Sequence, residues 1–147
     1  MDESEKILDL YLLTSSLLLL KMMVLIVLTI TKRMSTKAFV SEEDAVYFNG
    51  EVKTDESVER IRRAVQNDLE NVIPFIVIGY LYLATRPPVQ LAYILFLTFL
   101  LARVLHSICY AVVVARQPMR AVCWGIGFFI TGVMTVSIII HCIIKFL

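Results

Sequence analysis

Residues 58–83 read VERIRRAVQNDLENVIPFIVIGYLYL, a charged half that runs without a break into an apolar half. Within the charged half, Arg63, Asn67 and Glu70 stand at positions i, i+4 and i+7, so a helix carries all three on one face. Charged groups this close to an apolar segment are costly in lipid unless they face protein or a ligand. The stretch therefore predicts a membrane helix with a polar site near one end.

The rest of the chain is equally apolar. Of its 147 residues, 59% are hydrophobic, and the mean hydropathy is +0.78, which is above the range of soluble domains. Several apolar runs reach the ~20 residues that cross a bilayer as a helix. These runs are Ile7–Thr31, Val65–Thr85, Val89–Ala115 and Ala121–Leu147. The expected fold class is an all-α integral membrane protein, one domain over residues 1–147, with four transmembrane helices in a bundle.

Basic residues predict the orientation of these helices. Most of them lie between the first and second apolar runs or between the third and fourth, which places them on one side of the membrane. They are Lys32, Arg33, Lys37, Lys53, Arg60, Arg62, Arg63, Arg116 and Arg120. The opposite side holds Lys6, Arg86 and Lys145. The positive-inside rule places the loop over residues 32–59 in the cytosol and both termini on the other side. A net charge of +1 gives no indication of nucleic-acid binding.

A second polar stripe lies in the third apolar run, where Arg103, His106 and Tyr110 stand at i, i+3 and i+7. Two facing stripes would form a pocket for a small, highly charged ligand at the membrane edge. Arginine binds carboxylates with two parallel hydrogen bonds, and glutamate can hold an ammonium group. A self-satisfied network that holds helices together is the alternative for the first stripe.

Arg120 is the strongest single candidate for a functional residue. It follows Gln117-Pro118, an expected tight turn, at the start of the fourth helix, where free N–H groups favour an anion. A guanidinium there would stabilise a thiolate and lower the pKa of the thiol from about 8.5. The alternative is that Arg120 only anchors its helix at the cytosolic surface of the membrane, as the positive-inside rule describes.

Lys21 lies midway along the first apolar run, where a lone ammonium costs ~3 kcal/mol or more. We expect it to form a structural ion pair with Asp68. A short helix should begin after Ser41, whose side chain precedes three acidic residues. Pro74 should kink the second membrane helix. The three cysteines lack metal-ligand spacing, so no metal site is expected.

The sequence Val58–Asn71 resembles the second-helix signature of the membrane-associated eicosanoid and glutathione metabolism proteins, the MAPEG family. The resemblance is to the branch with type-1 microsomal glutathione transferase and microsomal prostaglandin E synthase. Supporting segments in the same order are Lys21-Met22-Met23, Lys37-Ala38-Phe39, Ile73-Pro74-Phe75, Arg103–Tyr110 and Gln117–Ala121.

The resemblance implies a homotrimer in the endoplasmic reticulum membrane, with the outer mitochondrial membrane as a second location. It also implies that glutathione binds between protomers near the cytosolic surface. The residues that match the glutathione site of the family are Arg33, Arg63, Asn67, Glu70, Arg103, His106, Tyr110 and Arg120. Arg120 matches the arginine that stabilises the glutathione thiolate, and Asp44 matches an aspartate of the prostaglandin branch.

The implied activity is conjugation of glutathione to lipophilic electrophiles that arrive from membrane lipid, with reduction of lipid hydroperoxides as a related reaction. A glutathione-dependent prostaglandin E synthase, an endoperoxide isomerase that uses Asp44, is the alternative. Ala121 stands where that synthase has a serine, which favours the transferase. Ala45 replaces the cysteine through which the type-1 transferase is activated by thiol reagents. A lipid-binding scaffold without turnover is a third hypothesis.

Overall fold

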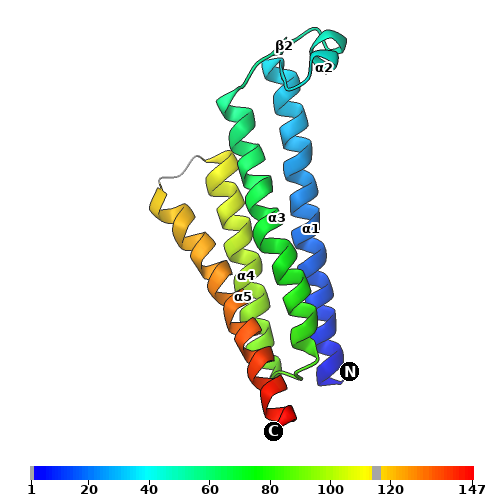
Figure 1. Cartoon of the computed structure of the whole chain (residues 1–147), viewed down its shortest axis with the longest axis vertical. Helices are drawn as coiled ribbons and strands as arrows, with labels where there is room; N and C mark the ends of the chain where they lie inside the picture. Colours follow the sequence, from blue (N-terminus) through cyan, green and yellow to red (C-terminus); the bar gives the residue numbers. More distant parts are fainter. Residues whose placement is uncertain (1, 114–116) are drawn as a thin grey trace.

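The computed structural model describes residues 2–113 and 117–147. In this part of the chain, four long helices run side by side along one axis, with the two termini at the same end (Figure 1). They are α1 (Glu3–Thr36), α3 (Glu56–Leu83), α4 (Val89–Ser107) and α5 (Gln117–Phe146). The chain is thus all-α in its main architecture. Helix α1 packs against α3 and α4, and α5 packs against the same two helices from the other side.

Aromatic side chains form the centre of the bundle. Phe75, Phe96 and Phe99 are fully buried, and the rings of Phe75 and Phe99 stack with their centroids 3.6 Å apart. Tyr11 on α1 donates a hydrogen bond of 2.9 Å to the carbonyl of Ile76. Helix α3 continues through Pro74 to Leu83. The aromatic core therefore joins α1 and α4 to the apolar half of α3.

Within the described ranges, three helical segments are long and apolar enough to cross a membrane: α1, α5 and the continuous segment Val89–Val112. Large apolar side chains such as Leu12, Val27 and Phe129 are exposed on the outside of the bundle. Helix α3 is not among the three because its first half carries the charged stripe. The chain therefore has the helices of a membrane protein, while the expected fourth span stays a prediction.

A small cap connects α1 and α3. The expected short helix is present as α2 (Glu42–Tyr47), whose N-terminus is capped by a hydrogen bond from the Asp44 N–H to Ser41 Oγ. Two strands, β1 (Ala38–Phe39) and β2 (Glu51–Val52), pair in parallel on either side of α2. We did not expect them, because a strand of two residues is too short to leave an alternating pattern.

Helix boundaries differ from the sequence-based expectation at two sites. The expected turn at Gln117-Pro118 is wrong, because both residues lie in the first turn of α5. Proline is tolerated there because the N–H groups of the first turn have no acceptor within the helix. Helix α4 ends in a π-helix, η1 (Ile108–Val112), instead of continuing as a regular helix. The last two residues of the third expected span, 114 and 115, lie outside the described residues.

Candidate functional site

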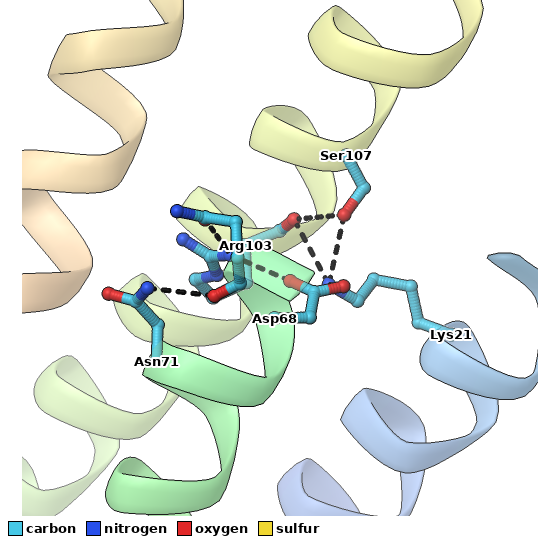
Figure 2. A network of polar contacts seen from close by, with 6 residues as sticks. Lys21, Asp68, Asn71, Arg103 and Ser107 are labelled. Carbon is cyan, nitrogen blue, oxygen red and sulfur yellow. Dashed lines mark hydrogen bonds and ion pairs between the residues drawn. The ribbon is translucent and has the colours of Figure 1, made fainter. Parts of the chain in front are cut away.

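A buried ion network joins three helices in the polar half of the bundle (Figure 2). Lys21 Nζ on α1 lies 2.6 Å from Asp68 Oδ2 on α3, and Arg103 Nη2 on α4 lies 2.6 Å from Asp68 Oδ1. The Asp68 and Arg103 side chains are 0% exposed, and that of Lys21 is 13% exposed. Lys21 also donates to Ser107 Oγ at 2.9 Å. Asp68 is thus shared between two cations, and the structure brings Lys21 into the contact expected from the sequence.

We expected Arg103 to line a ligand pocket, and part of its guanidinium lies in the buried network. Its Nη2 donates to Asn67 Oδ1 at 2.7 Å as well as to Asp68, so it is part of the buried network. Its Nε and Nη1 have no hydrogen-bond partner among the described residues. Among the described residues, the network therefore has one surplus positive charge and two guanidinium nitrogens without a partner, which suits an additional anion.

Gly127 lets α5 approach Arg103 closely. A Cβ atom at this position would lie 3.3 Å from Arg103 Cδ and 3.4 Å from Phe99 Cε2. By contrast, a Cβ atom at Gly125 on the same helix would meet no atom within 4 Å. The absence of a side chain at Gly127 thus sets the distance between α5 and the buried arginine.

We expect Gly127→Val to lower the free energy of unfolding by about 1–3 kcal/mol, because the new methyl groups would overpack the contact with Arg103 and Phe99. Gly125→Val is the matched control, since it adds the same side chain to open space. Thermal unfolding of both variants in the same detergent measures the difference. Equal melting temperatures for the two variants would contradict the role of this close approach.

The other two members of the α3 stripe pair with residues outside it. Arg63 Nη2 lies 2.5 Å from Oε1 of Glu56, which is about two turns closer to the helix start. Glu70 Oε1 accepts a hydrogen bond of 3.0 Å from Gln66 Nε2. The structure therefore does not join Arg63, Asn67 and Glu70 to one another, and Arg63 and Glu70 stay exposed.

A cation–aromatic contact brings together three elements at the polar end of the bundle. The Arg120 guanidinium on α5 lies 4.8 Å from the ring centroid of Tyr110 on η1, a favourable cation–π geometry. His106 lies 5.6 Å from the same ring, centroid to centroid. The hydrogen bond to Glu56 raises the pKa of Arg63, and an interaction with Tyr110 acts in the same direction. Tyr110 is therefore the side chain around which His106 and Arg120 gather.

Several nitrogen atoms of this region are buried and lack a hydrogen-bond partner within the described ranges. Besides the two of Arg103, they are Arg33 Nε, His106 Nδ1 and Arg120 Nε. Arg120 Nη2 donates to Gln117 Oε1 at 3.0 Å, so one edge of its guanidinium is used. Unpaired buried donors are costly in a protein. A ligand rich in carboxylate and carbonyl oxygens would satisfy the arginine nitrogens among them.

Arg33 and Asp44 were also expected at the site. Arg33, near the end of α1, lines a groove of about 440 Å³ between α1 and α3 together with Arg62 and Arg63. Asp44 is exposed on α2, which packs against β1 and β2 in the cap, away from the start of α5 (Figure 1). A single protomer therefore does not bring Asp44 to Arg120.

Sequence reasoning missed Ser107, Gly127 and Glu56 as partners of the charged residues. Ser107 stands four residues after Arg103, so helical spacing was a usable signal for it. Glu56 stands seven residues before Arg63, on the same face. Nothing in the sequence distinguishes Gly127 from Gly125, because only the packing of α5 separates them.

Apolar helices around a buried ion network, with unpaired donors at one end, define an integral membrane protein with a polar site. The sequence model of the MAPEG family matches residues 11–140, which include nearly all of the bundle. The chain belongs to the MAPEG family.

Curated relatives of this chain include proteins with two different names. Microsomal glutathione S-transferase 1 of Rattus norvegicus is 40% identical over 123 residues, which cover 80% of this chain and 79% of the relative. The human protein of that name is also 40% identical over 123 residues, with the same coverage. Human prostaglandin E synthase is 37% identical over 119 residues, which cover 80% of this chain and 78% of the relative.

Proposed function

We propose that this protein is a membrane-bound glutathione transferase that conjugates glutathione to lipophilic electrophiles. The observation that carries the proposal is the Arg120 guanidinium, which is stacked on Tyr110 and has a buried Nε without a partner in the described chain. A fixed cation with a free donor stabilises a thiolate and lowers the pKa of the thiol. The names of the transferase relatives support the same activity.

In the proposed reaction, Arg120 holds the glutathione sulfur as a thiolate beside the bilayer. Arg63, Asn67, Glu70, Arg103, His106 and Tyr110 are the proposed contacts of the tripeptide. The guanidinium groups would bind its carboxylates, and Glu70 would hold its ammonium group. Electrophiles partition into lipid and reach the thiolate from that side, while glutathione arrives from water. The same thiolate would reduce lipid hydroperoxides.

The proposal extends to assembly and location. Arg33 lines the α1–α3 groove together with Arg63, and we propose that it contacts glutathione bound to a neighbouring protomer. A homotrimer with glutathione between protomers would supply that contact. We further propose four membrane spans, residence in the endoplasmic reticulum membrane, with the outer mitochondrial membrane as a second location, and termini outside the cytosol. Membrane lipid is then the source of the electrophile.

A prostaglandin E synthase is the second candidate, because several relatives have that name. The isomerisation needs a group that moves a proton near the thiolate. Asp44 would have to come from the cap of a neighbouring protomer, since α2 lies away from the start of α5 in its own protomer (Figure 1). Ala121, next to Arg120, has no hydroxyl for this purpose. These two features make the transferase the better supported function.

The test is turnover of 1-chloro-2,4-dinitrobenzene and of a prostaglandin endoperoxide by the same purified protein with glutathione. We expect conjugation of the first compound and little isomerisation of the second. Efficient isomerisation that is lost in Asp44→Asn would replace the transferase proposal by the synthase. Glutathione binding without either reaction would support the scaffold without turnover.

A further inference from the structure

Three sulfur atoms gather where η1 meets the first turns of α5. Cys109 Sγ on η1 lies 3.4 Å from Met119 Sδ on α5. Cys123 stands four residues after Met119, and this spacing places both side chains on the same face of α5. Both thiols are buried, since Cys109 is 8% and Cys123 is 7% exposed. The spacing of the cysteines along the chain did not indicate this cluster, because its members lie on different helices.

Cys123 belongs to the face of α5 that packs against α4 and η1. One turn before it on this face, Met119 touches Cys109. One turn after it, Gly127 lies against Arg103, where a Cβ atom would come within 3.3 Å of Arg103 Cδ. The Cys109 and Cys123 thiols also interact electrostatically. Cys123 therefore stands between two contacts that hold α5 in place, with its thiol near that of Cys109.

The ligand atoms of this cluster are all soft. Two thiols and a thioether select Cu(I) over hard ions such as Mg²⁺ and Ca²⁺. Structural zinc sites almost always have about four ligands from cysteine, histidine and carboxylate side chains. Among the described residues, no group of three or more histidine, cysteine, aspartate or glutamate side chains could supply them. The composition of the cluster therefore fits Cu(I), which accepts fewer ligands and binds a thioether as well as thiolates.

The surroundings of the cluster favour the negative charge that such a complex carries. Each thiol releases its proton to water when it binds the ion, so Cu(I) with two thiolates has one net negative charge. Arg103 belongs to the ion network, which has more cations than anions. Arg120 stands three residues before Cys123. Both arginines have a buried Nε without a partner in the described part of the chain, so a buried anionic complex would be compensated there.

We propose that Cys109, Met119 and Cys123 form a binding site for one Cu(I) ion. The bound ion joins η1 to the start of α5 through sulfur ligands from both elements. The site is separate from the proposed transferase function, because it uses none of the residues assigned to glutathione.

Competition with bicinchoninate, which forms a coloured complex with Cu(I), measures the affinity directly. The purified protein is freed of glutathione, because that thiol binds Cu(I) itself, and ascorbate in oxygen-free buffer keeps the ion reduced. We expect the protein to take one Cu(I) per chain from the chelator. The single tryptophan of the chain, Trp124, is next to Cys123, so its fluorescence should change until the same ratio is reached.

Variants of the three ligands test which sulfur atoms bind the ion. Cys109→Ser and Cys123→Ser should each lower the affinity by roughly 100-fold or more, and Met119→Leu by about tenfold, because even residues that only support a metal ligand typically contribute 10–100-fold. Cys142→Ser is the matched control. It removes the exposed thiol of the same helix and should keep both the affinity and the fluorescence change.

Equal affinity in Cys109→Ser and Cys142→Ser would overturn the inference, and so would Cu(I) binding that leaves the fluorescence of Trp124 unchanged. If a serine variant did not fold, Met119→Leu would decide, because unchanged affinity in that variant contradicts a site of three sulfur atoms. A protein that takes no Cu(I) from the chelator would show that the cysteines only pack as small apolar side chains. Failure of the transferase proposal looks different, since it would abolish conjugation of 1-chloro-2,4-dinitrobenzene and leave the Cu(I) titration as expected.

Discussion

Arg120→Ala is expected to lower kcat for conjugation of 1-chloro-2,4-dinitrobenzene by about 100- to 1,000-fold. That is the usual loss when one group that stabilises developing or resident charge at a reacting centre is removed. The pKa of the glutathione thiol should return toward about 8.5 in the variant, because the adjacent cation that favours the thiolate is gone. The KM for glutathione should change much less than kcat.

Two measurements separate this effect from a loss of folding. The ultraviolet absorbance of the bound thiolate, titrated against pH, should shift to higher pH in Arg120→Ala. Arg60→Ala removes an arginine whose nearest acidic partner, Glu56, is 4.0 Å away, and it should keep both kcat and the titration. A variant Arg120→Ala that binds glutathione and turns over normally would exclude the role of this guanidinium in thiolate stabilisation.

Asp68→Asn is expected to lower the free energy of unfolding by about 3–5 kcal/mol. Asp68 is the single carboxylate between Lys21 and Arg103, and its side chain is fully buried. Without its charge, two cations would remain in the bundle with no anion between them, which is the most costly way to break a buried ion pair. Thermal unfolding in detergent measures the change.

The control is an ion pair of similar length on the surface of the cap. Glu51 Oε2 lies 2.9 Å from Lys53 Nζ, and both side chains are exposed. Glu51→Gln should leave the melting temperature unchanged, because exposed pairs contribute little to stability. A melting temperature for Asp68→Asn equal to that of Glu51→Gln would show that the buried network does not stabilise the bundle.

The sequence predicted the helices well because their signals are local. The cap at Ser41 and the apolar runs depend on neighbouring residues and on helical spacing. The contact between Lys21 and Asp68 was also predictable, since a lone ammonium in an apolar helix requires a partner. The two-residue strands and the π-helix η1 were missed because no periodic pattern accompanies such short elements.

The partners of the remaining charged residues were not predictable. We expected Arg103 to face a ligand together with His106 and Tyr110, and we did not expect that its Nη2 would also bond to Asp68 and Asn67. The rotation of α4 about its own axis decides this, and that rotation depends on the packing of four helices at once. The glutathione contacts of this set stay a prediction.

By itself, the sequence determined that the chain is helical and apolar and that it carries charged residues in or beside its apolar segments, because burial and helix periodicity act over short distances. Only the tertiary structure decided which cation meets Asp68, how Arg120 reaches Tyr110, and which cysteine lies beside Met119. Each of these depends on distances between helices far apart in sequence. Those distances follow from the simultaneous packing of all the helices.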